Sequence, residues 1–370
     1  MPRARKVKQA TDLSDDIRTR FQTSPYWEYE RFLGQGAFGA TFLLRERDHV
    51  VRKQKRMALK LAQHENAYDL RHEMQVLEGL RGAKHIVKML ASCKNLAKAD
   101  TGPERNSEDL SSIELIVEKL GPLISIPPST AFRPLAGLSG AAMALEFLEY
   151  GDLYHFAETV RKARRRWPDR VLWSLFLCMI RVCIGMAYPP GRRADQPLVL
   201  ETINPDIPAK VLTNSDIAKR NIMITSGDGH GEHHDGHMFK MIDFGLTEDL
   251  GGYPYNLHDV AMIVSGLIDS KRYPEGYELW KGHMSRRRAL LPTKGHDPYP
   301  EVDFALRDLI GRCTYYNVDV RPTLEVALAE ATKAVARASD TFPTPAIETD
   351  EAIREFWQTL LHNPPTAGPS

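Results

Sequence analysis

The chain has few cysteines, almost no net charge and no apolar run long enough to cross a bilayer. Its 370 residues include only four cysteines, at spacings typical of neither a disulfide framework nor a metal site, which indicates a reducing compartment. The net charge is +1, so no overall field favours nucleic acid or a membrane surface. The most apolar segment, 172–188, is interrupted by Arg181 and shorter than a bilayer span, which predicts a buried core helix.

The first 26 residues are polar and basic and lack the apolar stretch of a signal peptide. This composition predicts a flexible N-terminal arm. A solvated tail is the favoured interpretation of its basic run, and a nuclear-import sequence is the alternative. That run consists of Arg3, Arg5, Lys6 and Lys8. We therefore expect a cytoplasmic protein, with a nuclear location as the alternative.

Residues 213–245 contain an acid, an amide and a second acid, Asp216, Asn221 and Asp243. Apolar runs follow the asparagine and precede the second aspartate, which predicts a β-hairpin with these three residues at its base. Phosphoryl transfer needs a carboxylate that orients the attacking hydroxyl, and hard oxygen ligands for Mg²⁺. The D-x-x-x-x-N spacing is weak alone, so the hypothesis depends on the rest of the chain.

A glycine-rich segment near the N-terminus contains Gly34, Gly36 and Gly39. Glycine lets a hairpin backbone lie close to phosphates, because no side chain intervenes. A dinucleotide-binding fingerprint has the same spacing, but there the glycines open a helix. Residues 40–44 are typical of a strand, which favours the hairpin.

Lys60 lies in a strand-like segment, 57–61, and an amphipathic helix is predicted after it. Glu73 on that helix is the expected partner of Lys60, and Glu78 is the competing one, nearer the helix end. The alternative is that Lys60 points to solvent, as most lysines do. The apolar residues at helical spacing are Leu70, Met74, Leu77 and Leu80.

In this order, the motifs resemble those of the eukaryotic protein kinases, in a divergent form similar to small fungal kinase-like proteins. The resemblance covers about residues 28–340 and includes a hinge-like segment at 143–153, Asp259 before an apolar helix, and Arg321-Pro322-Thr323. It implies an α+β, bilobal fold around a cleft: a small β-rich N-lobe with one helix, and a larger, mainly helical C-lobe.

The expected organisation follows from this resemblance and the residue pattern. A short amphipathic helix is predicted in the tail, docked in cis or on a partner. The divisions are an arm at 1–26, an N-lobe at 27–148 with an insertion at about 96–140, a C-lobe at 149–340, and a tail at 341–370.

The resemblance also implies ATP and Mg²⁺ as cofactors and a protein hydroxyl as the acceptor, with no nucleic-acid or membrane partner. It makes Lys60, Glu73 and Asp216 the catalytic set, with Lys60 on the phosphates and Asp216 on the substrate hydroxyl. Asn221 and Asp243 would bind Mg²⁺. The nucleotide-binding residues that it implies are Gly34, Gly36, Gly39, Lys60, Glu146, Leu148, Asn221 and Asp243.

Several positions depart from the family pattern. Asn214 and Ser215 replace the histidine and arginine of H-R-D, so switching by a phosphorylated activation loop is predicted to be absent. Only residues 246–258 separate Gly245 from Asp259, and A-P-E is missing. Arg321, which pairs with the glutamate of A-P-E in the family, should meet a substitute acid, Glu248 or Asp249, or solvent. The acceptor residue type stays open, because Ala218 replaces the lysine of Ser/Thr kinases and Arg220 is typical of tyrosine kinases.

Three functions remain: a protein kinase, with Ser/Thr slightly favoured over Tyr; a kinase-like phosphotransferase for a small molecule; and a nucleotide-binding scaffold without activity. The first is preferred. Four histidines in the predicted hairpin turn favour a solvated loop, with a metal site as the alternative. They are His230, His233, His234 and His237.

Overall fold

The protein combines a small antiparallel sheet with a helical part, and the chain divides into two compact units. The first unit comprises 1–82, 87–147 and 191–197, and the second comprises 83–86, 148–190 and 198–370. The computed structural model describes residues 13–36, 39–47, 55–62, 67–93, 141–193, 196–269, 276–287, 290–293 and 295–362. The fold is therefore mixed α+β, as the sequence predicts.

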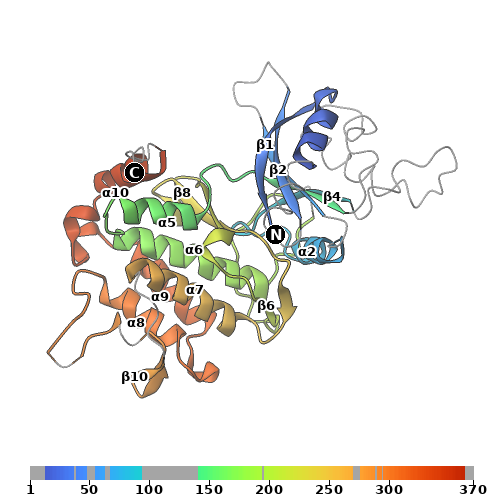
Figure 1. The fold of residues 1–370 in the computed structure, drawn as a ribbon. Coiled ribbons are helices and arrows are strands. Elements are labelled where there is room, and N and C mark those ends of the chain that lie inside the picture. The colour runs from blue at the N-terminus through green and yellow to red at the C-terminus, as the bar shows by residue number, and fades with distance from the viewer. Residues whose placement is uncertain are drawn as a thin grey trace. The chain divides into compact units, whose positions relative to one another are not determined.

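The first unit is built on a five-stranded antiparallel sheet in the order β1-β2-β3-β5-β4, with helix α2 beside it (Figure 1). All four predicted apolar positions of the helix, from Leu70 to Leu80, are buried. The elements are β1 (Trp27–Gln35), β2 (Ala40–Glu46), β3 (Arg56–Leu61), α2 (Ala67–Gly79), β4 (Met89–Cys93) and β5 (Ala142–Glu146).

The glycine-rich segment connects β1 to β2 as a hairpin. The backbone N–H of Gly36 donates to the carbonyl oxygen of Gly39 at 2.9 Å. A strand, not a helix, follows the glycines, so the dinucleotide-binding alternative is wrong. Gly39 is required by packing, because a Cβ there would lie 2.1 Å from the carbonyl oxygen of Leu61.

The prediction of a flexible arm at 1–26 is wrong for its second half. Residues 13–22 form a helix whose Ile17 and Phe21 are buried against Trp27 and Phe42 of the sheet. This helix is short, and its few apolar residues are separated by charged ones, so the sequence pattern did not reveal it. Residues 1–12, with the basic run, and the insertion predicted at 96–140 lie outside the described residues.

The second unit is organised around helix α6, against which α7, α9 and β8 pack (Figure 1). The prediction that this segment is too short for a bilayer span is wrong, because helix α6 is long and apolar enough for one. Its apolar window is 94% buried inside the protein, so the core-helix prediction is confirmed. The α-helices of this unit are α5 (Leu153–Lys162), α6 (Asp169–Ala187), α7 (Tyr253–Ile268), α8 (Phe304–Cys313), α9 (Leu324–Val335) and α10 (Asp350–Trp357).

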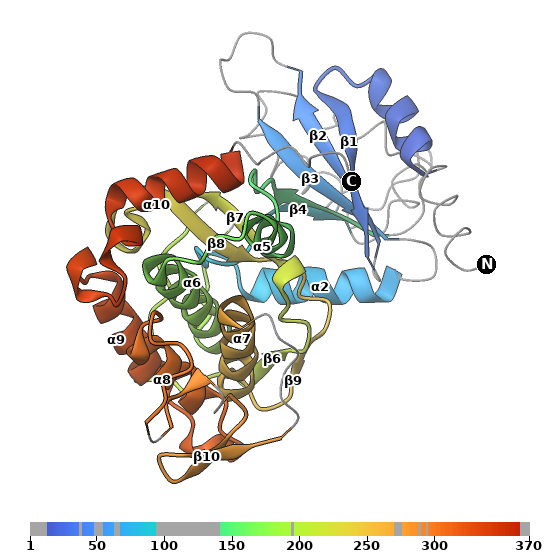
Figure 2. The same cartoon turned by 60° about the vertical axis from the view of Figure 1, so that its left-hand side comes forward.

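The short strands of this unit form two-stranded antiparallel sheets. The predicted hairpin is β7 with β8, in register from Ile222 opposite Met241 to Ser226 opposite His237. Figure 2 shows this hairpin beside α5 and α6. The strands are β6 (Leu212–Asn214), β7 (Ile222–Ser226), β8 (His237–Met241), β9 (Thr247–Asp249), β10 (Glu278–Trp280) and β11 (His283–Ser285), and β6 pairs with β9 and β10 with β11.

Short helical turns complete the second unit. The 3₁₀ turns are η3 (Lys219–Asn221), η4 (Gly231–His233), η6 (Val318–Val320), η7 (Ser339–Thr341) and η8 (Pro345–Ile347), and η9 (Gln358–His362) is a π-helical turn.

The C-terminal helix α10 packs onto its own chain. Trp357 is fully buried, stacks on His237 with ring centroids 4.2 Å apart, and stacks on Phe156 of α5 at 5.2 Å. Its indole N–H donates to Asp235 Oδ2 at 3.1 Å. The apolar face predicted for the tail is therefore occupied within the second unit.

The segment before α10 caps the N-terminus of α6. Both carboxylate oxygens of Glu348 accept hydrogen bonds from backbone N–H groups, of Asp169 at 2.7 Å and of Arg170 at 3.0 Å. These are orphan donors of the first helical turn, so a carboxylate there also meets the positive end of the helix dipole. This arrangement also buries the carboxyl group of Asp169 beside two other carboxylates, those of Glu348 and Asp303.

Burial, reinforced by the charges of Glu348 and Asp303, raises the pKa of Asp169 to about 7. The native state therefore retains a proton that the unfolded chain releases near pH 4. It follows that this group stabilises the fold at acidic pH, and its contribution is lost as pH rises from about 4 to 7.

Asp169→Asn should remove this part of the pH dependence, because an amide stays neutral throughout. Wild type should lose up to about 1.4 kcal/mol per pH unit from this group across the window, and the variant should not. Urea unfolding at pH 5, 6 and 7 measures the difference, with the exposed Asp340→Asn as control. Equal slopes in wild type and Asp169→Asn would contradict the assignment.

Candidate functional site

The predicted ion pair of the first unit is present and buried. Lys60 Nζ of β3 lies 2.6 Å from Glu73 Oε2 of α2. The side chain of the competing Glu78 is 38% exposed, and its Oε1 lies 3.9 Å from Nη2 of Arg81. Lys60 therefore does not point to solvent, and its carboxylate partner is the expected Glu73.

The acid and the amide of the second unit are joined directly. Asn221 Nδ2 donates to both the backbone oxygen and Oδ2 of Asp216, each at 2.9 Å. Because the amide nitrogen of Asn221 binds Asp216, the amide oxygen of Asn221 points away from Asp216. The backbone oxygen of Asn221 accepts from the N–H of Ile242 at 2.8 Å, which ties it to the residue before Asp243.

Asp243 has a backbone conformation that is uncommon for residues other than glycine. Its φ is +63°, in the left-handed region, although it is not a glycine. Its Oδ1 accepts from the N–H of Gly245 at 3.4 Å, and the intervening Phe244 is fully buried. Strain of this kind concentrates at functional sites, where the surrounding structure maintains it.

Asn214 connects the two acids. Its Oδ1 accepts from the backbone N–H of Asp216 at 2.9 Å, and its Nδ2 donates to the backbone oxygen of Asp243 at 3.1 Å. The side chain is fully buried at the end of β6. The sequence pattern showed this residue only as a departure from H-R-D, whereas its amide supplies both a donor and an acceptor to this network.

A further asparagine, which the sequence analysis missed, supports Asn214 from helix α7. Asn256 Oδ1 accepts from the backbone N–H of Asn214 at 3.0 Å, and its Nδ2 donates to the backbone oxygen of Leu212 at 2.9 Å. The motif had drawn attention to Asp259, whose side chain is 42% exposed beside His258. The available signal was helical spacing, since Asn256 falls on the buried apolar face of the helix.

Replacing Asn214 with alanine should remove, from a fully buried position, the hydrogen bonds to the N–H of Asp216 and to the carbonyl oxygen of Asp243. The expected cost is about 1–3 kcal/mol of stability, together with misplacement of both Asp216 and Asp243. Chemical unfolding checks the first effect, with the exposed Asn204→Ala as control. An unfolding midpoint equal to wild type would show that the bridge contributes nothing.

Arg220 forms an ion pair with Asp216 from one turn further along the chain. The guanidinium side chain is 63% exposed, so solvent screens this pair and it adds little to stability. It places a cation beside the carboxylate that the sequence assigns to the acceptor hydroxyl.

The remaining residues expected to bind nucleotide are two glycines with free space around them, Glu146 at the end of β5, and Leu148. A Cβ at Gly34 or Gly36 would meet nothing within 4 Å, so packing among the described residues does not require glycine there. Glu146 ends β5, and its Oε1 accepts from the backbone N–H of Lys88 at 2.7 Å. Leu148 is the first residue of the next segment of the second unit and is buried.

The predicted site residues are thus divided between the two units. Lys60, Glu73, the three glycines and Glu146 belong to the first, and Leu148, Asp216, Asn221 and Asp243 to the second. In the first unit Lys60 contacts Glu73, and in the second Asn221 contacts Asp216 while Asn214 connects Asp216 with Asp243.

Arg321 is satisfied by carbonyl groups, not by the expected acid. Its Nε donates to the backbone oxygen of Tyr315 at 2.8 Å and its Nη1 to that of Pro254 at 2.9 Å. The predicted partners Glu248 and Asp249 form no such bond with it among the contacts of the described residues. Burial lowers the pKa of this half-buried guanidinium.

Two of the four turn histidines are not solvated, which corrects the loop prediction. His233 and His237 are buried, whereas His230 and His234 are exposed. His237 stacks on Trp357, and His233 reaches a histidine that is distant in sequence. Sequence spacing within the turn showed neither contact, because both partners lie elsewhere in the chain.

A scan against models of protein families found none that matches this chain, and a search of curated proteins found no relative.

Proposed function

We propose that the chain is a protein kinase that transfers the γ-phosphoryl group of ATP to a protein hydroxyl, on a kinase-like bilobal fold. The observation that carries the proposal is the network in which Asn214 and Asn221 hold Asp216 and Asp243. A carboxylate for the acceptor and an amide–carboxylate pair for a metal are the groups that this transfer requires. The buried Lys60–Glu73 pair adds the cation that the phosphates need.

The donor set fits Mg²⁺ and ATP. Mg²⁺ takes hard oxygen ligands from one or two protein groups together with phosphate oxygens. Asp243 offers a carboxylate, and Asn221 offers an amide oxygen because its nitrogen is bound to Asp216. Bound Mg-ATP would supply the phosphoryl group, while Lys60 would hold its phosphates and Asp216 would orient the hydroxyl.

Asn214 weakens the case for an inactive scaffold. Loss of the family histidine motivated that alternative, yet Asn214 bonds to both acids from the same position. The small-molecule alternative remains motivated by the short segment after Gly245, which leaves little chain for docking a peptide. Arg220 beside Asp216 does not decide between serine, threonine and tyrosine as the acceptor.

The decisive experiment identifies where the phosphate of labelled ATP goes. The purified protein is incubated with γ-labelled ATP and Mg²⁺, with either a cell extract of proteins or a fraction of small metabolites. Label on protein supports the proposal, and label only on metabolites supports the small-molecule alternative. Nucleotide binding without transfer, seen as a rise in Tm with Mg-ATP, supports the scaffold, and neither binding nor transfer would contradict all three.

Activity should not require phosphorylation of the segment after Gly245. Thr247 is buried in β9, which already pairs with β6, so this segment is ordered without a phosphate. The expected turnover of protein shown by mass spectrometry to be unphosphorylated equals that of Thr247→Ala, Tyr253→Phe and Tyr255→Phe. An inert unmodified protein that gains activity on phosphorylation of one of these residues would contradict this prediction.

A further inference from the structure

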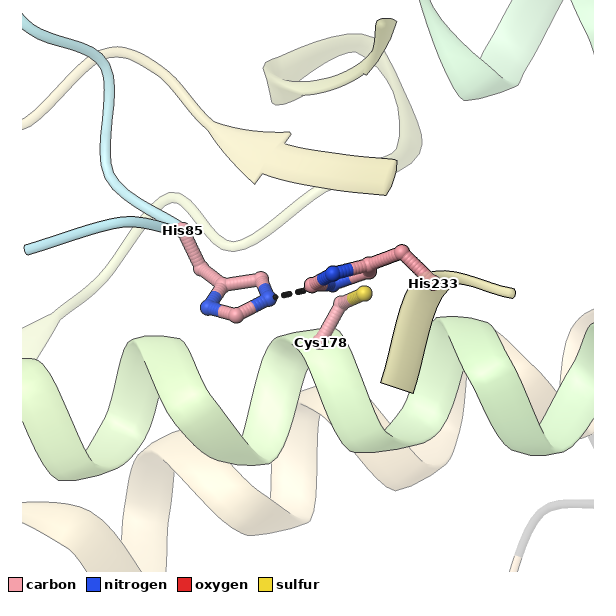
Figure 3. A group of neighbouring side chains, drawn as sticks. All are labelled: His85, Cys178 and His233. Atoms are coloured by element: carbon pink, nitrogen blue, oxygen red, sulfur yellow. Dashed lines mark hydrogen bonds between the residues drawn. The ribbon is translucent and has the colours of Figure 1, made fainter. Parts of the chain in front are cut away.

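Three buried side chains outside the acid–amide network converge within the second unit. They come from distant positions: His85 from the segment 83–86, Cys178 from α6 and His233 from η4 (Figure 3). Their ligand atoms all lie within 4.8 Å of one another, and the two Nε2 atoms are 2.9 Å apart. All three side chains are at most 2% exposed.

The backbone around each member is firmly held. The carbonyl oxygen of His85 accepts from the N–H of Met241 in β8 at 2.9 Å. The turn η4 is tied to α6, because Arg181 of that helix forms an ion pair with Glu232, the neighbour of His233. His85 is therefore tied to β8 and His233 to α6, the helix that carries Cys178, and such fixed positions are what a preorganised metal site requires.

Each histidine has a carboxylate behind it. Glu201 Oε2 lies 2.7 Å from His85 Nδ1, and its Oε1 accepts from the backbone N–H of His85 at 2.7 Å. Asp228 Oδ1 lies 3.4 Å from His233 Nδ1. A carboxylate that receives the Nδ1 proton of a histidine, leaving Nε2 to coordinate, is the usual outer partner of a zinc ligand.

When both Nδ1 protons are donated to these carboxylates, both Nε2 lone pairs face each other beside the sulfur of Cys178. Two facing lone pairs repel unless a proton or a metal ion lies between them. A simple hydrogen bond between the rings would need one Nε2 proton, and the Nδ1 of that neutral ring would then turn a lone pair toward its carboxylate.

We propose that His85, Cys178 and His233 bind a zinc ion. Two imidazoles and a thiolate suit Zn²⁺, with bonds of about 2.0–2.1 Å to nitrogen and about 2.3 Å to sulfur. Tetrahedral coordination would place the nitrogens roughly 3.3 Å apart, so the rings need to separate only slightly, and water takes the fourth position. The ion connects segment 83–86, α6 and η4, and so stabilises the second unit independently of the proposed function.

The test begins with the metal content of the full chain, purified without chelators or metal-affinity resin. Mass spectrometry of the elements should find about one zinc per chain. After removal of zinc, Co²⁺ should restore a site with visible d–d bands and a near-ultraviolet thiolate-to-cobalt band. A chelator should lower the Tm of the zinc protein, because the ion binds only the folded state.

Matched variants assign the ligands. Cys178→Ser should abolish the thiolate band, whereas Cys183→Ser, buried on the same helix, should retain it. His85→Gln and His233→Ala should lose zinc, whereas His230→Ala, an exposed histidine of the same turn, should keep it. Chelator should then leave the Tm of the ligand variants unchanged.

Three outcomes would overturn the proposal: folded wild type with neither zinc nor a cobalt spectrum, equal loss of metal in the controls, or copper in place of zinc. If Cys178→Ser does not fold, the His233→Ala protein still decides, because its circular dichroism shows whether it is folded and its cobalt titration shows whether the site survives. Retention of one zinc in folded His233→Ala would overturn the ligand assignment.

Discussion

Glu73→Gln should destabilise the first unit by about 3–5 kcal/mol, the usual cost of removing one partner from a buried ion pair. The side chain of Glu73 is 1% exposed and lies 2.6 Å from Lys60 Nζ. Glutamine has nearly the same shape, so the loss isolates the charge. The ammonium group would stay in a low-dielectric environment without the carboxylate that compensates it.

Urea unfolding followed by fluorescence measures this effect as a lower midpoint. Glu78→Gln is the matched control, because it lies on the same helix in a more exposed position. Its change should stay within about 0.5 kcal/mol, as for ordinary surface substitutions. Equal midpoints for the two variants would show that the Lys60–Glu73 pair does not stabilise the unit.

Asp216→Asn should lower phosphoryl transfer by about 10²–10⁴-fold, the contribution of a positioned general base. The asparagine cannot accept the proton of the acceptor hydroxyl, although it can keep a hydrogen bond to Asn221. Nucleotide affinity should be unchanged, since Asp216 is not among the proposed Mg²⁺ ligands. The effect should therefore appear in kcat and not in the Mg-ATP-dependent rise of Tm.

Initial rates with labelled ATP, measured beside an Mg-ATP thermal titration, test both halves of this expectation. Asp206→Asn, an exposed aspartate on the loop before β6, is the control and should keep wild-type turnover. If Asp216→Asn kept more than about a tenth of the wild-type rate, the residue would not be the general base.

Local patterns predicted much of the architecture. The apolar segment 57–61 predicted a strand, the helical spacing from Leu70 to Leu80 predicted a helix, and both elements formed as expected. The core helix α6 and the β7–β8 hairpin were predicted for the same reason. The helix at 13–22 was missed, because its burial depends on the sheet that it covers.

Motifs also named the residues of the candidate site, since each step of phosphoryl transfer requires a particular side-chain type. They could not show how those residues are held. Asn214 differed from the expected pattern and so looked like a loss, although an amide can both donate and accept. Arg321 was expected to meet a substitute acid or solvent, yet it bonds to two carbonyl groups.

The sequence by itself determined the mixed α+β class, the main elements and the pairing of Lys60 with Glu73. Tertiary structure alone decided the roles of Asn214 and Asn256 and the meeting of His85, Cys178 and His233. The physical reason is distance along the chain. Periodicity and motif spacing describe neighbours within one element, whereas Asn256 contacts Asn214 across 42 positions and His85 contacts His233 across 148. Both contacts depend on how whole elements pack.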